Sequence, residues 1–319
     1  MFRWWTEGLR CRVLQVLLAG LIAPTAAQGQ EAPGGLYFID AHSQIDKRTD
    51  PSVVIQLMNE GGVRRLILST TGHASQEVVL TLARQFPERI VPAVRTKQYM
   101  TQMSVDRFKG MLAEQADSDV YGAMAEVLLY HAAKSMEGGR FEAQEVVVTP
   151  DDARVEMALE TAIAHHWPFI AHIEFAAAGS RRAEFMTKFE TLITRHPEEP
   201  FLLIHLGQLN AAEVGRLIAE HPNVYFLTST ATPIAARRGG QPWTNMFKNT
   251  SLTGEWKAML TAHPDRFVLA FDNVVAPNWG PSYLNQIRLW RSALQELPNA
   301  AAQMIAHGNA ERLWRLPAS

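Results

Sequence analysis

The residues best suited to chemistry lie at the ends of apolar segments. Over residues 39–46 the chain reads IDAHSQID, so that an apolar run closes on His42, with Gln44 two positions later. Residues i and i+2 of a β-strand point to the same side. His42 and Gln44 can therefore face one point at the end of a strand, as two potential metal ligands.

Four further polar residues occupy comparable positions, within or directly after short apolar runs: Glu126, His172, His205 and Asp272. Each alone has an ordinary explanation. A histidine is readily satisfied by hydrogen bonds in a core, an aspartate caps a helix, and Glu126 could pair with Arg95. Together they indicate a metal site, because buried polar groups are costly unless paired or metal-bound. Imidazoles and carboxylates form a divalent transition-metal set, most often for zinc.

The elements that must position these residues alternate between strands and helices. Eight apolar segments are predicted strands: Leu36–Ala41, Arg65–Ser69, Ile90–Val94, Tyr121–Leu128, Pro168–Ile173, Phe201–Leu206, Val224–Thr228 and Phe267–Phe271. Eight segments with apolar residues at three- and four-residue spacing are predicted helices: Ser52–Glu60, Ser75–Phe86, Val105–Ala116, Pro150–His166, Arg181–His196, Ala211–His221, Gly254–His263 and Pro281–Leu297. This pattern predicts an α/β fold, a single (β/α)8 TIM barrel with its chemistry at the carboxyl ends of the strands. An open doubly wound sheet is disfavoured, since no glycine-rich phosphate turn follows the first strand.

The N-terminal segment predicts export. Arginines precede the apolar run Val13–Ala23, and small residues follow it up to Ala27. This is the pattern of a secretory signal peptide, residues 1–27, which would leave residues 28–319 as the barrel domain. The alternative is an uncleaved interfacial or anchoring helix. The only cysteine, Cys11, lies in this segment, so we expect a periplasmic or secreted mature protein without disulfides or thiolate ligands.

Composition bears on the partners. The 30 lysines and arginines nearly balance the 32 aspartates and glutamates, for a net charge of −2. This balance gives no electrostatic argument for nucleic acid or for an anionic membrane. We therefore expect a small-molecule substrate, no nucleic-acid partner and no membrane contact after signal cleavage, while a homo-oligomer stays open.

At this point the chain resembles a known family, the amidohydrolase superfamily, and within it the amidohydrolase-2 branch of metal-dependent TIM-barrel hydrolases and decarboxylases. The family's first strand carries Asp-Ala-His-x-His, and residues 40–44 read DAHSQ. His172, His205 and Asp272 match its histidines on strands five and six and its aspartate on strand eight. Residues 305–313 match its closing signature. The resemblance covers nearly all of the predicted barrel domain.

The resemblance implies a divalent metal, most often zinc, held by residues at the barrel mouth: His42, Gln44, Glu126, His172 and Asp272. It also implies that Asp272 accepts the proton of the attacking water and that His205 polarises the substrate. Such a metal lowers the pKa of water towards neutrality, and a carboxylate then takes its proton. The implied reaction is hydrolysis of a small, carboxylated ester, lactone or amide, or alternatively a metal-dependent decarboxylation.

Gln44 departs from the family pattern, which has a second histidine at this position. An amide oxygen is a neutral and weaker ligand than imidazole. Three outcomes stay open: the amide oxygen ligates in a weakened or altered site, the metal shifts towards Glu126, or the metal is lost. The last would leave a metal-independent lactonase or an exported, non-catalytic binding barrel.

Substrate-binding residues are predicted at the same mouth. Arg95 and Lys97 end the third strand and could hold a substrate carboxylate, or form a salt bridge to Glu126 or Glu174. Trp279 follows the eighth strand and could stack on a substrate or pack against the rim.

The segment after the seventh strand, Ser229–Thr250, is long enough to form a lid. It carries Arg237, Arg238 and Trp243. The arginines could equally be solvated charges.

Overall fold

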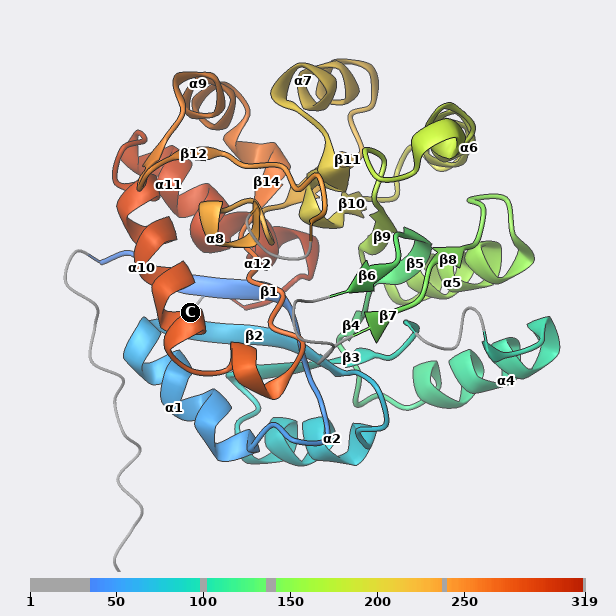
Figure 1. Cartoon of the computed structure of the whole chain (residues 1–319). Helices are drawn as coiled ribbons and strands as arrows, with labels where there is room; N and C mark the ends of the chain where they lie inside the picture. The colour runs from blue at the N-terminus through green and yellow to red at the C-terminus, as the bar shows by residue number, and fades with distance from the viewer. Residues whose placement is uncertain (1–34, 98–101, 136–141, 237–239, 318–319) are drawn as a thin grey trace, which may run out of the picture.

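The computed structural model describes residues 35–97, 102–135, 142–236 and 240–317 (Figure 1). The predicted signal peptide with Cys11, the first residues of the predicted barrel domain, and Arg237 and Arg238 lie outside the described residues. Within those four ranges, no helix is long and apolar enough to cross a membrane.

The chain has an α/β fold built on parallel strands. One sheet has the order β1 (Phe38–Ile45), β2 (Val63–Thr70), β3 (Ile90–Val94) and β4 (Ala123–Met124). The other has the order β14 (Phe267–Val268), β11 (Val224–Leu227), β10 (Phe201–Leu203), β9 (Phe169–Ile173), β5 (Val127–His131) and β8 (Val146–Val147). Only β8 runs antiparallel to its neighbour in these two sheets, pairing with the end of β5.

The backbone connects the two sheets on both sides. Strands β4 and β5 follow one another in the chain, with only Ala125 and Glu126 between them. On the other side, β1 meets the segment after β14. The Ala41 amide donates to Leu269 O over 3.0 Å, and the Asp272 amide donates to His42 O over 2.9 Å. The parallel strands therefore form a curved, barrel-like sheet, with polar residues at both junctions.

Eight longer helices surround the strands in Figure 1: α1 (Pro51–Gly61), α2 (Gln76–Gln85), α4 (Val105–Ala116), α5 (Ala153–His165), α6 (Arg182–Arg195), α7 (Ala211–Glu220), α9 (Gly254–Ala262) and α10 (Pro281–Leu294). Most begin at a side-chain cap. Asp50 accepts from the Ser52 amide at the start of α1, and Asn210 forms a capping box with Glu213 in α7. Each helix lies close to its predicted range, although α5 begins three residues after the predicted Pro150, at the cap Asp152.

Shorter elements complete the chain: β6 (Lys134–Ser135), β7 (Glu142–Ala143), α8 (Pro233–Ala236), β12 (Phe247–Lys248), β13 (Ser251–Leu252), α11 (Asn299–Gln303), the π-turn η5 (Met304–Gly308) and α12 (Asn309–Leu313). The predicted lid segment therefore contains a short helix and the first strand of the β12–β13 hairpin, and is not structureless. Asn309 ties the last helix to the base of β14, because its amide donates to the carbonyls of Pro264 and Phe267, each over 2.8 Å.

Three predicted strands are shorter or interrupted. The eighth ends at Val268 instead of Phe271, and the changes in the other two shape the site. The fourth predicted strand breaks between Met124 and Val127, where Glu126 lies. The sixth ends at Leu203, because the following turn Ile204–Gln208 takes left-handed backbone angles, with φ of 57° at His205. A non-glycine residue in this region is strained by about 1 kcal/mol or more, so the surrounding contacts must hold the turn in place.

The strands are buried on both faces, as their continuous apolar sequence predicts. Alternate residues belong to two clusters. Phe38 packs with helix residues such as Val54, whereas Ile39 lies in an inner cluster of small and branched side chains that α12 closes with Leu313. The inner cluster, which α12 closes near the amino ends of the strands, therefore supports their carboxyl ends, where the polar residues converge.

Candidate metal centre

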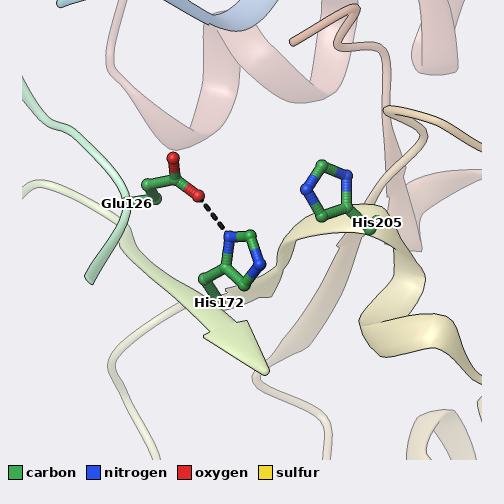
Figure 2. Close-up of side chains that lie close together, drawn as sticks. All are labelled: Glu126, His172 and His205. Atoms are coloured by element: carbon green, nitrogen blue, oxygen red, sulfur yellow. Dashed lines mark hydrogen bonds and ion pairs between the residues drawn. The ribbon is translucent and has the colours of Figure 1, made fainter. Parts of the chain in front are cut away.

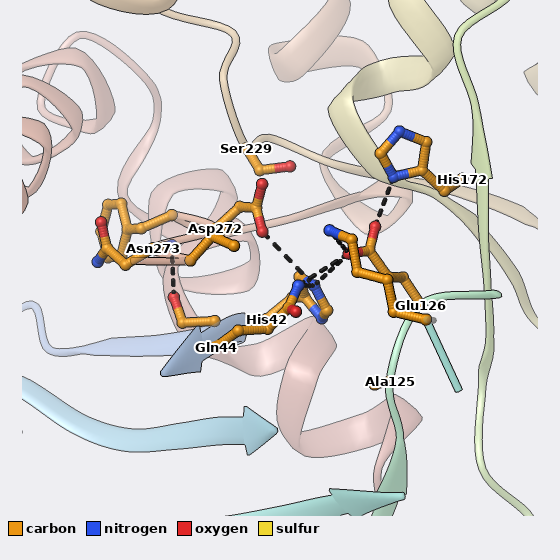
Figure 3. Close-up of polar contacts among 12 residues, drawn as sticks. His42, Gln44, Ala125, Glu126, His172, Ser229, Asp272 and Asn273 are labelled. Atoms are coloured by element: carbon orange, nitrogen blue, oxygen red, sulfur yellow. Dashed lines mark hydrogen bonds and ion pairs between the residues drawn. The ribbon is translucent and has the colours of Figure 1, made fainter. Parts of the chain in front are cut away.

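The predicted ligands converge at the carboxyl ends of the strands (Figures 2 and 3). Together with the predicted catalytic residue His205, they come from five places in the chain: His42 and Gln44 from β1, Glu126 from the break between β4 and β5, His172 from β9, His205 from the turn after β10, and Asp272 from the segment after β14. All are nearly inaccessible to solvent, with exposed side-chain fractions from 0% to 9%. Such burial strengthens every electrostatic interaction among them.

Glu126 is the centre of this network. Its Oε1 accepts from Gln44 Nε2 over 2.8 Å and from Lys97 Nζ over 2.5 Å, and its Oε2 lies 2.5 Å from His172 Nδ1 (Figure 3). Burial raises the pKa of Glu126, but the charges of Lys97 and His172 outweigh burial and hold the pKa well below its usual range. Glu126 is therefore an ionised carboxylate with three donors already in contact.

His172 lies between two carboxylates. Its Nδ1 meets Glu126 (Figure 2), and its Nε2 lies 3.0 Å from Oε1 of Glu174. Burial lowers the pKa of His172, but the two glutamates raise it above its usual value. Both ring nitrogens then donate, and the ring presents no lone pair to a metal in this arrangement. The predicted ligand role of His172 would require release of one carboxylate.

Glu174 has its own cationic partner. Lys134 Nζ donates to Oε1 of Glu174, and the Ala132 amide donates to Oε2 over 2.8 Å. Burial raises the pKa of Glu174, yet His172 and Lys134 bring it well below the usual range. Lys134 also lies 3.0 Å from His131 Nε2 and 4.6 Å from the centre of the Trp243 ring.

The amide of Gln44 is oriented by its neighbours. Its nitrogen, which can only donate, lies 2.8 Å from Glu126 and 3.2 Å from His42 Nε2. A reversed amide would place its oxygen against the carboxylate, so the contact with Glu126 fixes the orientation. Nε2 of His42 consequently accepts from Gln44, so a metal bound to Nε2 would have to displace this hydrogen bond. Gln44 Oε1 is buried and has no hydrogen-bond partner among the described residues.

Asp272 differs from the two glutamates. Its Oδ1 lies 3.6 Å from His42 Nε2, and its Oδ2 lies 3.6 Å from His205 Nε2. Over the described ranges, these imidazoles are its only ion-pair partners, and Oδ1 accepts no hydrogen bond. Burial, with repulsion from Glu126, raises the pKa of Asp272. Asp272 is thus a buried carboxylate with no described lysine or arginine at ion-pairing distance, although the charge of Lys97 lowers its pKa from farther away.

His205 is held as a neutral ring. Burial, together with the positive charge of His172, keeps its pKa well below the usual value. The hydroxyls of Ser229 and Thr230 both lie 3.0 Å from Nδ1. The left-handed backbone at His205, and at Asp272 with φ of 50°, aims the two side chains at each other.

The predicted substrate residues lie in different environments. Arg95 is buried and donates to the backbone carbonyls of Gly72 and Ala74. Lys97, whose side chain is 20% exposed, forms an ion pair with Glu126, which is one of the salt bridges that the sequence left open for Arg95 and Lys97. The Trp279 indole is buried and donates to Gln44 O over 2.9 Å, so it supports the end of β1 from behind.

Sequence reasoning missed one residue that holds the site together. Asp40 is fully buried and accepts hydrogen bonds from the Phe271 amide over 3.0 Å, the Ser43 hydroxyl over 2.7 Å and the Tyr283 hydroxyl over 3.3 Å. Burial raises its pKa to about 6. The i, i+2 rule that linked His42 to Gln44 also places Asp40 on the same side of β1, and was the available signal.

The residues present fit a divalent cation. Three overlapping groups of ligand atoms lie within 4.8 Å of one another: His42 with Glu126 and Asp272, Glu126 with His172 and His205, and His131 with His172 and Glu174. In the first group, Asp272 Oδ1 is buried without a hydrogen-bond partner among the described residues, and so is Oε1 of Gln44, whose amide nitrogen contacts His42 and Glu126. Imidazole, amide and carboxylate donors of this kind suit zinc or a similar metal.

Comparisons with known proteins agree with this architecture. A TIM-barrel protein of unassigned function from Bordetella bronchiseptica aligns with a TM-score of 0.56 at 16% identity, covering 82% of each chain. The 4-oxalomesaconate hydratase of Rhodopseudomonas palustris aligns with a TM-score of 0.53 at 14% identity, covering 82% of this chain and 79% of the hydratase. A zinc-bound amidohydrolase from Burkholderia multivorans aligns with a TM-score of 0.50 at 15% identity, covering 88% of this chain and all of the other. At these identities the likeness shows the fold.

No curated protein matches the sequence significantly. The amidohydrolase family model, in contrast, matches residues 39–316, which include every strand of the barrel-like sheet except the first residue of β1. The chain therefore belongs to the amidohydrolase family, in its amidohydrolase-2 branch.

Proposed function

We propose that this protein is a metal-dependent hydrolase that acts on a small, carboxylated ester, lactone or amide. The observation that carries the proposal is Asp272, a buried carboxylate that faces two imidazoles and has no lysine or arginine within ion-pairing distance in the described part of the chain. A buried charge in this situation calls for a cation. Family membership supports an enzyme, since amidohydrolases are generally hydrolases or hydratases.

His42, Gln44 and Asp272 would hold the metal, for which zinc is the best match to the donor set. A divalent cation held there supplies Lewis acidity and lowers the pKa of water towards neutrality. Asp272 would accept the proton of the attacking water. This assigns Asp272 the catalytic role implied by the family resemblance.

His205 acts on the substrate oxygen. When the hydroxyl of Ser229 or of Thr230 donates to Nδ1, the neutral ring carries its proton on Nε2. From there it donates a hydrogen bond to the oxygen on which negative charge develops, and burial strengthens that bond.

Lys97 and Lys134 favour a carboxylated substrate. Each spends one donor on a glutamate, and each side chain keeps some exposure, 20% and 14%. An ammonium has three donors, so both can also reach an anion in the mouth. Trp243, beside Lys134, offers an apolar face to the rest of the substrate. In this proposal Arg95 and Trp279 do not contact the substrate, and they stabilise the backbone around the site.

We further propose that the curved sheet is a closed (β/α)8 barrel over residues 28–319, supported by the backbone bonds between β1 and the segment after β14. Residues 1–27 would be removed on export to the periplasm or the medium. The partner would be a small molecule, with no nucleic acid or membrane bound by the mature protein.

A metal-free lactonase is the second candidate, and one observation favours it: the Lys97 ammonium already lies against Glu126. A decarboxylase would use the same residues and differ in its product. A panel of carboxylated esters, lactones and amides, assayed with the metal-stripped and zinc-reloaded protein, tests these alternatives. Zinc-restored hydrolysis that Asp272→Asn abolishes and Asp265→Asn retains supports the proposal, whereas hydrolysis that survives complete stripping would favour the metal-free alternative, and carbon dioxide release without hydrolysis would favour the lyase.

A further inference from the structure

The three ligand groups compete for the same side chains. Glu126 belongs to two of them and His172 to two. A second ion beside the first would have to use Glu126 or Glu174 as its carboxylate. The number of ions that the site can hold therefore depends on whether these glutamates are available.

Both glutamates already have an ammonium partner. Lys97 Nζ lies 2.5 Å from Oε1 of Glu126, and Lys134 Nζ contacts Oε1 of Glu174. Each glutamate has two further donors: Gln44 and His172 for Glu126, and His172 and the Ala132 amide for Glu174. A metal ion bound to Glu126 would have to displace one of these donors and would lie next to the Lys97 charge in a site of low effective dielectric.

The side of the site around Asp272 differs from the side around Glu126. No lysine or arginine among the described residues forms an ion pair with Asp272, and two oxygens, Gln44 Oε1 and Asp272 Oδ1, have no hydrogen-bond partner there. The Gln44 amide connects the two sides, since its nitrogen donates to Glu126 while its oxygen is left over.

We propose that Lys97 is a built-in cation that keeps Glu126 out of metal ligation, so that the chain binds a single divalent ion, at His42, Gln44 and Asp272. The inference rests on the proposed metal dependence and extends it to the number of ions and to the role of Lys97. Lys97 is thus a positioning residue that sets which carboxylate meets the metal.

Zinc titration of the metal-free full-length protein, by calorimetry and elemental analysis, tests this. We expect one equivalent in the wild type. Lys97→Met should bind zinc about tenfold more tightly, because a like charge is removed and Glu126 becomes a ligand. Lys97→Arg retains the charge and should stay near the wild-type affinity. The matched control, Lys134→Met, removes the ammonium that pairs with Glu174. It should change the zinc affinity less than Lys97→Met does.

The charge-neutral double variant Lys97→Met/Glu126→Gln covers the case in which the single variant does not fold. If Glu126 is not a ligand, its zinc affinity should stay within about tenfold of the wild type. A larger loss would show that Glu126 ligates and would overturn the inference, as would two equivalents in the wild type or no gain in a folded Lys97→Met protein. Zinc binding that appears only in Lys97→Met would contradict both the single wild-type ion and the proposed metal dependence, although it would show that Lys97 keeps a metal from the site. Its absence from both proteins would contradict both proposals.

Discussion

Asp40 connects β1 to the segment after β14, and substitutions at this position should show how much the connection contributes to stability. Its Oδ1 accepts from the backbone amides of His42 and Phe271, over 3.3 and 3.0 Å, and its Oδ2 accepts from the hydroxyls of Ser43 and Tyr283. These bonds join β1 to the segment after β14. A substitution that keeps one acceptor oxygen at position 40 should therefore lose much less unfolding free energy than one that removes both oxygens.

Asp40→Asn keeps one oxygen for the backbone amides, and its new amino group meets two hydroxyls that can rotate and accept. It also removes a buried charge whose pKa is raised to about 6. We expect a loss below about 2 kcal/mol of unfolding free energy. Asp40→Ala leaves buried amides and hydroxyls without their acceptor and opens a small cavity, so we expect a loss of about 3–5 kcal/mol.

Urea denaturation at pH 7.5, followed by circular dichroism and by tryptophan fluorescence, measures both variants against the wild type. Asp50→Ala, at the exposed cap of α1, is a suitable comparison, since loss of a surface cap costs only about 1 kcal/mol. Equal losses for Asp40→Asn and Asp40→Ala, or a loss below 1 kcal/mol for Asp40→Ala, would refute the reasoning.

Three further predictions address separate features. Gln44→His should bind zinc about tenfold more tightly, because imidazole is a stronger ligand than an amide oxygen, and unchanged affinity in calorimetry would argue that residue 44 does not face the metal. Burial raises the pKa of Glu199 to about 7, so the folded state holds this proton more tightly than the unfolded state, and stability falls as pH rises from about 4.5 to 7. Because Glu199 is only partly buried, Glu199→Gln should gain about 1 kcal/mol at pH 8 and nothing at pH 4, and equal melting shifts at both pH values would count against this. Mass spectrometry of the exported protein should find Gln28 at the amino terminus, whereas an intact Met1 would exclude cleavage after Ala27.

Simple rules predicted much of the fold. Apolar periodicity located the longer helices to within a few residues, and the strand order follows from alternating strands and helices. The same rules brought His42, Gln44, His172 and Asp272 to one end of the sheet, because each follows or ends an apolar strand. These features depend on local sequence and on the geometry of parallel strands.

The pairings inside the site could not be predicted in the same way. The sequence left the Lys97–Glu126 salt bridge open beside a substrate contact and could not choose between them, because the two residues follow different strands. Lys134 reaches Glu174 from just after β5, the strand that pairs with β9, and each pair depends on side chains distant in the chain. The left-handed turn at His205 is held by contacts with Ser229 and Thr230 rather than by a glycine at that position. Tertiary contacts determine these details, and they decide which donors stay available.

The central claim is that Asp272 and its neighbours hold a divalent metal. Elemental analysis of the purified protein, with Asp272→Asn and the exposed control Asp265→Asn in parallel, tests it most directly. The account predicts close to one zinc or similar ion per chain in the wild type and in Asp265→Asn, and its loss from a folded Asp272→Asn protein. A wild type without metal after growth with added zinc and manganese, or full metal content in Asp272→Asn, would contradict it.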